Sequence, residues 1–158
     1  MERIPNIKVA ASGDRYKDAA ILCNQYADGN NKGEYGWAAA INAALALEIY
    51  LKSFLSKEVL TSVGSGVNMV TAKTERGHNL VELYNKIPAN IQDLIISCSL
   101  AINPNIELLK SLEKFKDYFF NARYCYELES IKSVDSSVVD LASHMYLVLL
   151  KVAETTHN

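Results

Sequence analysis

The sequence lacks an excess of positive charge, and this absence limits its function. Its 158 residues contain 16 Lys and Arg against 18 Asp and Glu, which gives a formal net charge of −2. Proteins that attract nucleic acid through their overall charge carry a clearly basic domain or surface. The composition therefore excludes whole-chain attraction to a polyanion and leaves only local basic patches for such a role.

Cysteine is also scarce, and its spacing forms no motif. The three residues, Cys23, Cys98 and Cys125, are odd in number and none belongs to a Cys-x-x-Cys pair. This pattern argues against a disulfide framework and against a zinc site. We expect three reduced, mostly buried thiols in a cytoplasmic protein, with no metal and no cofactor.

Long uninterrupted apolar runs are missing as well. The N-terminus, MERIPNIKVAASGD, lacks the apolar core of a signal peptide. The most apolar segment, residues 37–55, is interrupted by Asn42, Glu48 and Lys52, whereas a membrane-spanning helix needs about 20 nearly uncharged residues. We therefore expect a buried core helix and no membrane partner.

Helical periodicity with turn signals between the segments accounts for most of the chain. Ser12 or Asp14 is expected to cap the first helix, His78 or Asn79 to open the third, and Asp135 or Ser136 to cap the last. The predicted helices cover residues 15–27, 34–56, 80–87, 89–100, 106–128 and 138–153.

Residues 57–77 carry no helical pattern. We expect an irregular, mobile loop there, with a short hairpin around Gly64 and Gly66 as the alternative. The prediction is an all-α, single-domain helical bundle of about six helices over residues 1–158, with its core at about 12–155.

One carboxylate falls within an apolar face of the second helix. Glu48 lies in the middle of a stripe formed by Trp37, Ile41, Ala44, Leu51 and Leu55. A buried carboxylate must be paired, hydrogen-bonded or protonated. We predict that Glu48 is mostly buried and contacts Lys52, His78 or Arg123. A structural ion pair and a functional site carboxylate both remain open.

The fifth predicted helix places an arginine at the edge of an aromatic stripe. Arg123 is followed by Tyr126 and Glu127, beside a stripe that contains Leu108, Leu112, Phe115, Phe119, Ala122 and Tyr126. Arg123 can form a structural pair with Glu127. It can alternatively contact a nucleotide or phosphate, because the guanidinium fork suits phosphate oxygens.

Two histidines outside the frayed C-terminus have different expected positions. His78 precedes a helix and is expected to act as a cap or to form a hydrogen bond between loop and core. His144 is expected on the polar side of the last helix, paired at the surface with Asp140. Spacing alone supports no Ser/His/Asp or Cys/His catalytic arrangement.

The last helix is apolar over a wide arc. Its apolar residues are Val138, Val139, Leu141, Ala142, Met145, Tyr146, Val148, Leu149, Leu150 and Val152. One neighbouring helix would not cover this arc, and we therefore expect the chain to self-associate.

Three segments, taken in order, resemble HEPN domains. They are the Glu48-x-x-x-Lys52 helix, the Arg76-Gly77-His78-Asn79-Leu80 segment, and the late Arg123-Tyr124-x-Tyr126-Glu127 segment that Phe119 precedes. Their order and spacing agree with the family over about residues 35–127.

The resemblance implies an all-α domain that dimerises through its helices. Many members are metal-independent ribonucleases of toxin–antitoxin and phage-defence systems; others are non-catalytic modules that bind RNA or nucleotides, or partners of small nucleotidyltransferases. Catalytic members carry an arginine followed, after four to six residues, by a histidine. Arg123 matches the arginine, but positions 128–130 are Leu128, Glu129 and Ser130.

We therefore expect a homodimeric, non-catalytic HEPN-like module that binds RNA, a nucleotide or a protein partner such as a nucleotidyltransferase. The candidate site residues are Glu48, Lys52, His78, Arg123, Tyr126 and Glu127. The alternative is a divergent metal-independent ribonuclease with a composite dimer site, in which His78 or His144 replaces the missing acid/base.

Overall fold

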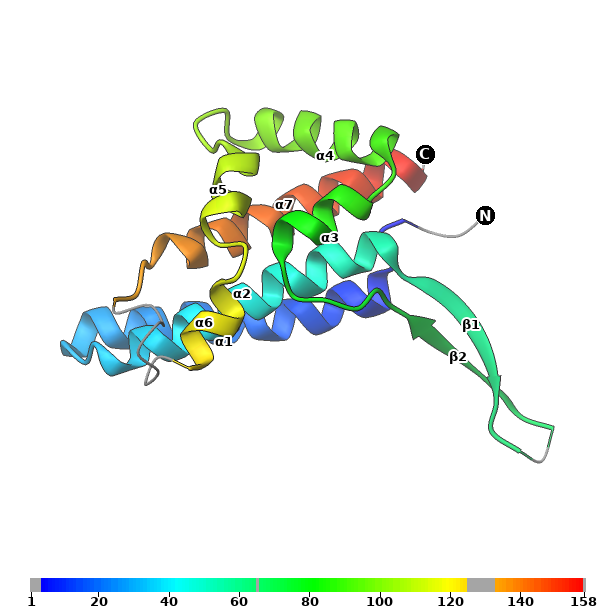
Figure 1. Ribbon diagram of the computed structural model, residues 1–158, viewed down its shortest axis with the longest axis horizontal. Coiled ribbons are helices and arrows are strands. Elements are labelled where there is room, and N and C mark those ends of the chain that lie inside the picture. Colours follow the sequence, from blue (N-terminus) through cyan, green and yellow to red (C-terminus); the bar gives the residue numbers. More distant parts are fainter. Residues whose placement is uncertain (1–3, 65, 125–132, 158) are drawn as a thin grey trace.

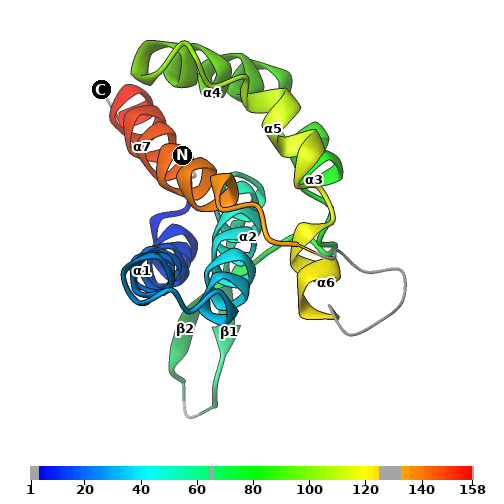
Figure 2. The same cartoon turned by 90° about the vertical axis from the view of Figure 1, so that its left-hand side faces the viewer.

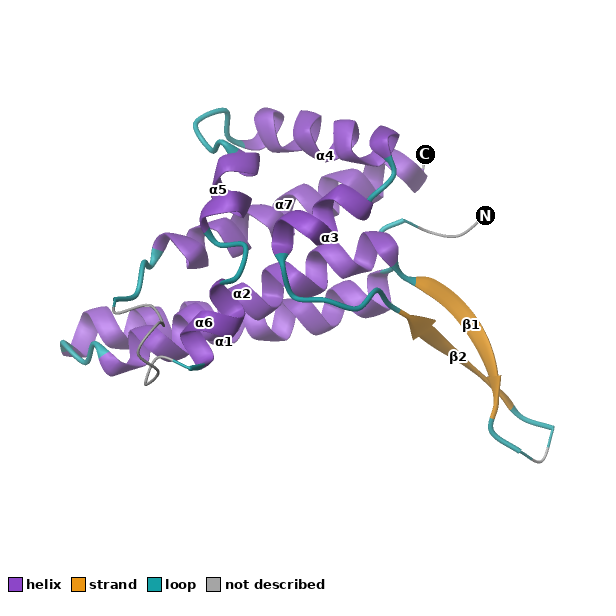
Figure 3. Cartoon of the chain, in the orientation of Figure 1, coloured by secondary structure: helices purple, strands orange, loops and turns teal. Residues whose placement is uncertain are grey.

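The computed structural model describes residues 4–64, 66–124 and 133–157 (Figure 1). Helices dominate these residues, and one two-stranded antiparallel sheet leaves the helical body, so the helical-bundle prediction is confirmed in its coarse form (Figure 3). The elements are α1 (Ile7–Asn30), α2 (Glu34–Leu55), β1 (Lys57–Ser62), β2 (Asn68–Lys73), α3 (Leu80–Lys86), α4 (Ala89–Ile102), α5 (Leu108–Lys114), α6 (Tyr118–Arg123) and α7 (Ser137–His157).

Helix α1 begins earlier than the sequence patterns predicted. Asn6 caps it, because its side-chain oxygen accepts hydrogen bonds from the backbone N–H groups of Lys8 (3.1 Å) and Val9 (3.2 Å). Ser12 and Asp14, the two expected caps, lie inside the helix. The predicted caps were wrong because α1 continues through Gly13, which lies against the ring of Tyr50, where a larger residue would not fit.

Helix α2 is the centre of the bundle. It packs against α1, α3, α6 and α7, and Figure 2 shows it between α1 on one side and α6 on the other. Small residues, several of them alanines that are at most 2% exposed, let the neighbouring helices approach closely. By length and composition α2 could cross a membrane, but 61% of its most apolar stretch is buried inside the fold, as expected for a core helix.

The apolar arc of α7 is covered within the chain. Helices α2, α4 and α1 all pack against α7, and the residues of the arc that are buried are Val138, Val139, Leu141, Ala142, Met145, Val148, Leu149 and Val152. Since several helices of the same chain cover this surface, it no longer argues for self-association.

The fifth predicted helix is two helices in the structure, α5 and α6, with a break at Phe115, Lys116 and Asp117. The carbonyl of Lys116 accepts a hydrogen bond from the backbone N–H of Leu80, at the start of α3 (3.0 Å). The expected end of this helix, residues 125–128, lies outside the described residues.

The segment expected as a mobile loop contains a β-hairpin. Strands β1 and β2 pair in a register from Lys57 opposite Lys73 to Ser62 opposite Asn68. Gly64 (φ 88°) and Gly66 (φ 73°) take positive φ values at the turn, which glycine adopts without strain. The hairpin, the alternative weighed for this segment, projects from the body of the protein (Figure 1).

Candidate functional site

Glu48 is buried in α2 and both of its carboxylate oxygens are used. Its exposed fraction is 3%. Oε1 accepts a hydrogen bond from Lys52 Nζ (2.7 Å), and Oε2 lies 2.9 Å from His78 Nδ1. The prediction that Glu48 is buried against at least one of the three expected partners is confirmed for Lys52 and His78. Arg123 is not among its ion-pair partners in the described part of the chain.

The segment that carries His78 is fixed on both sides. Gly77, with φ 111°, turns the chain just before it. Asn79 follows and caps α3, since its side-chain oxygen accepts from the backbone N–H groups of Val81 and Glu82 (3.0 Å each). The side-chain amide of Asn79 also donates to Asp117 (2.9 Å), in the break between α5 and α6. His78 is therefore held at the junction of α2, α3 and α6.

The pairing with Glu48 determines which ring nitrogen of His78 faces outward. An ionised carboxylate only accepts hydrogen bonds, so Nδ1 of His78 is the donor and Nε2 carries the lone pair. Within the described ranges Nε2 has no hydrogen-bond partner, and the His78 side chain is 56% exposed. The imidazole therefore presents Nε2, a hydrogen-bond acceptor in this tautomer, to solvent.

Phe119 brings His78 and Arg123 into one cluster. Its ring centroid lies 5.7 Å from that of the His78 ring and 5.2 Å from the Arg123 guanidinium carbon. Both positions are within the range of ring stacking and of a cation–π interaction. The structure thus links Arg123 to Glu48 indirectly, through Phe119 and His78.

The outer side of α6 continues this cluster with further aromatic rings. The Arg123 guanidinium also lies 5.3 Å from the Tyr124 ring, and the Tyr124 ring lies 5.0 Å from that of Phe120. Phe120 is 53% exposed, an unusual position for a phenylalanine. We define the aromatic–cation surface as His78, Phe119, Phe120, Arg123 and Tyr124.

Sequence reasoning missed Phe119 and Phe120 as members of the site. Phe119 was assigned to the core stripe, and Phe120 gave no signal beyond its position next to Phe119. Of the six candidate residues, Glu48, Lys52 and His78 are in direct contact and Arg123 joins them through Phe119. Tyr126 and Glu127 lie outside the described residues.

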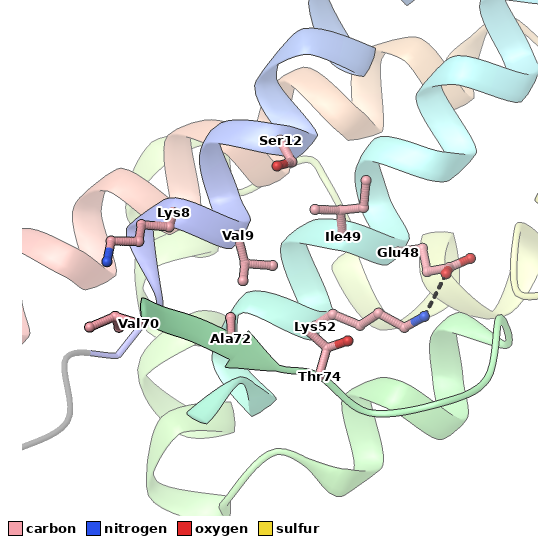
Figure 4. Close-up of a pocket in the computed structure, with 9 residues that line it drawn as sticks. All are labelled: Lys8, Val9, Ser12, Glu48, Ile49, Lys52, Val70, Ala72 and Thr74. Carbon is pink, nitrogen blue, oxygen red and sulfur yellow. Dashed lines mark hydrogen bonds and ion pairs between the residues drawn. The ribbon is translucent and has the colours of Figure 1, made fainter. Parts of the chain in front are cut away.

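A pocket of about 520 Å³ lies on the hairpin side of Lys52 (Figure 4). Its apolar lining comes from α1, α2 and β2, and its lining residues are Lys8, Val9, Ser12, Glu48, Ile49, Lys52, Val70, Ala72 and Thr74. Both lysines are paired with carboxylates, Lys52 with Glu48 and Lys8 with Glu58 (3.7 Å). The pocket therefore offers an anion little free charge.

His144 is not where the sequence placed it. It is 5% exposed and its Nε2 lies 2.7 Å from the hydroxyl of Ser99, between α7 and α4. Burial lowers the pKa of the His144 imidazole below its ordinary value. The surface pair with Asp140 was wrong because α4 covers the side of α7 that the sequence pattern left to solvent. His144 is thus part of a helix interface.

Comparison of the chain with family models, with curated proteins and with solved structures finds no match. Within the described ranges, no group of three or more His, Cys, Asp or Glu side chains is placed to hold a metal ion. The Glu48–His78 pair and the aromatic–cation surface are the features of the described residues from which a function can be inferred.

Proposed function

We propose that the chain is a HEPN-like, non-catalytic module that binds single-stranded RNA or a nucleotide at the aromatic–cation surface. The observation that supports this most directly is the placement of His78 and Arg123 on the same ring, that of Phe119. The three HEPN-like segments meet at this point: one supplies Glu48, the second His78, and the third Phe119 and Arg123.

The chemistry of the surface suits a phosphate and a neighbouring base. The Arg123 guanidinium presents a planar fork of donors that matches phosphate oxygens. Exposed rings such as Phe120 provide a face on which a base can stack, and stacking of this kind is the usual basis of single-strand recognition. Glu48 fixes the orientation of His78 and so prepares the surface before the ligand binds.

Fluorescence anisotropy with a labelled single-stranded RNA tests the proposal. Arg123→Ala should weaken binding about tenfold or more, since a hydrogen bond to a charged group is worth about 1.5–3 kcal/mol. Arg15→Ala, which removes an exposed arginine from α1, is the matched control and should bind as the parent does. Equal affinity of the parent and the Arg123 variant would exclude this surface as the binding site.

A second function, that of a metal-independent ribonuclease, has one observation in its favour. The Glu48–His78 pair has the arrangement of a carboxylate that orients a general base, with the free Nε2 beside a ring that also contacts Arg123. We expect the purified protein in EDTA not to cleave RNA through this site. Any residual cleavage should be the same in the parent, in Arg123→Ala and in His78→Ala. Reproducible cleavage lost in both variants, in a nuclease-free preparation, would establish the enzyme instead.

The setting that we propose follows from the three HEPN-like segments. It is a toxin–antitoxin or defence system in which the module acts as a cytoplasmic homodimer, alone or with a protein partner such as a nucleotidyltransferase. A gene for a small nucleotidyltransferase next to the gene for this chain would support a paired system. Copurification of the two proteins would test it directly.

A further inference from the structure

The hairpin exposes apolar side chains that the helical body does not cover. Every residue of β1 is exposed, and in β2 only Thr71 is partly buried. Leu60 is 70% exposed, more than any other large apolar residue in the described ranges. The remaining exposed apolar residues of the hairpin are Val59, Val63, Val67, Met69 and Val70.

Beyond its first two residues, Lys57 and Glu58, β1 lacks the features that keep an exposed strand from pairing. Residues 59–72 contain no charged residue and no proline, whereas exposed edge strands are usually protected by lysines, prolines or bulges. The strands pair without a bulge from Lys57 opposite Lys73 to Ser62 opposite Asn68. Two strands alone are at best marginally stable in water, and three or more are needed for a stable sheet.

We propose that a second copy of this chain pairs its β1 edge with the β1 edge of the first, forming a four-stranded sheet in the order β2-β1-β1-β2. The β1 edge is favoured because Val70 and Ala72 of β2 share a pocket with residues of α1 and α2, whereas β1 contacts α1 through the exposed pair of Glu58 with Lys8. This inference rests on the hairpin alone and does not depend on the RNA-binding proposal.

The β1 sequence suits pairing with itself. Antiparallel pairing about a two-fold axis at Leu60 places Leu60 opposite Leu60 of the second copy, and Val59 opposite Thr61. Glu58 then faces Ser62, so that no charged residue lies directly opposite another charged residue. One contact between two copies pairs the free backbone N–H and C=O groups of both β1 edges. A partner of a different kind would pair those of one hairpin only.

The shape of the protein permits this arrangement. The hairpin projects from one end of the bundle (Figure 1), and antiparallel pairing places the two helical bodies at opposite ends of the shared sheet. A bilayer would be a poor alternative occupant, because it offers no hydrogen-bond partners to the free backbone groups of the β1 edge.

Sedimentation velocity of the full chain at micromolar concentration tests the inference. We expect a dimer for the parent and a monomer for Leu60→Lys, since the substitution places two lysines face to face at the two-fold axis. Leu22→Lys is the matched control, because Leu22 is 66% exposed on α1, and it should remain dimeric. Leu60 is too exposed for its replacement to unfold the bundle, and circular dichroism verifies this.

A mixture of two variants makes the test specific to position 60. Leu60→Lys and Leu60→Glu should each be monomeric alone, and their equimolar mixture should recover the dimer, because opposite charges then face each other. A monomeric parent would overturn the proposal, as would a dimer that Leu22→Lys dissociates and Leu60→Lys does not. Flotation of a monomeric parent with lipid vesicles would assign the hairpin to a membrane instead.

Discussion

Glu48 has two partners that differ in their access to solvent. The Lys52 side chain is 15% exposed and the His78 side chain 56%. The bond to Lys52 lies within one turn of α2 and is shielded, whereas the bond to His78 joins two segments at the surface. The carboxylate therefore has a structural partner and a partner that a ligand can reach.

Replacing Glu48 with alanine should lower stability sharply. The change leaves Lys52 without its carboxylate in a shielded position, and breaking such a buried pair typically costs about 3–5 kcal/mol. Glu48→Gln keeps the shape and part of the hydrogen bonding and should cost less. Urea unfolding gives the comparison, and Glu58→Ala is the control, because the exposed pair of Glu58 with Lys8 is worth at most about 1 kcal/mol. An alanine variant as stable as the parent would contradict the structural role of Glu48.

Gly13 is a second residue whose identity the packing dictates. A Cβ at this position would lie 2.7 Å from Cε1 of the Tyr50 ring, and Tyr50 is fully buried. Glycine to alanine in a helix usually stabilises it by up to about 1 kcal/mol, but Gly13→Ala should destabilise the fold because overpacking costs about 1–3 kcal/mol. Gly36→Ala in α2, where no atom lies within 4 Å, is the control and should be neutral or stabilising. Thermal melts should therefore show a lower midpoint for Gly13→Ala and an unchanged or higher midpoint for Gly36→Ala.

At the scale of the elements, hydrophobic periodicity predicted the helices. It did not predict the helix break that involves a contact between residues distant in the sequence. Helix α2 was predicted almost to the residue, because its alanine- and leucine-rich sequence has both the propensity and the apolar faces of a core helix. The break between α5 and α6 was not predicted. It depends on a hydrogen bond from Leu80, 36 positions before Lys116 in the sequence, which a local pattern does not contain.

The hairpin and part of the site could not be predicted from local sequence patterns either. Strands are recognised by alternation of buried and exposed residues, but both faces of this hairpin are exposed, so its sequence lacks that alternation. Glu48 could be identified because a carboxylate interrupts an apolar stripe. The role of Phe119 could not, since only the folded chain shows that one ring contacts both His78 and Arg123.

The α4–α7 interface should make stability dependent on pH through His144. The lowered pKa of the buried imidazole means that the unfolded chain binds the proton more readily. The stabilisation is complete above the ordinary pKa of about 6.5 and is lost as the pH falls toward the lower folded value. Urea midpoints measured from pH 8 to pH 5 should decline for the parent. In His144→Gln the urea midpoint should fall less between pH 8 and pH 5. A decline as steep as that of the parent would contradict the attribution of this effect to His144.

The start of α7 contributes a separate acidic step. Pairing with Lys114 and hydrogen bonds from Ser137 lower the pKa of Asp135 from 3.8 to about 2. A lowered carboxyl pKa stabilises the fold above pH 3.8, and this contribution is lost as the pH falls to about 2. As the pH falls, the His144 step begins at about 6.5 and the Asp135 step only at about 3.8, so the two effects begin at different points of one titration.

For the whole molecule, the net charge of −2 means that the proposed binding of RNA depends on a local contact. If Arg123 neutralises about one phosphate, the logarithm of the affinity should fall against the logarithm of salt concentration with a slope of about −0.7, the value for one phosphate on a single strand. Anisotropy titrations over a range of salt concentrations measure this slope. Arg123→Ala should remove most of this dependence, and a much steeper slope in the parent would indicate a larger basic surface than the one described.

The bond between Glu48 and His78 joins residues 30 positions apart in the sequence, and the whole hairpin lies between them. The bond therefore closes a loop. If the two ends of that loop separate, the segment between them gains conformational entropy. Breaking it releases the base of the hairpin from the helical body, a local opening that leaves the core intact. Hydrogen exchange at the backbone amides of β1 and β2 consequently reports whether His78 is engaged with Glu48, although neither strand contains a residue of the site.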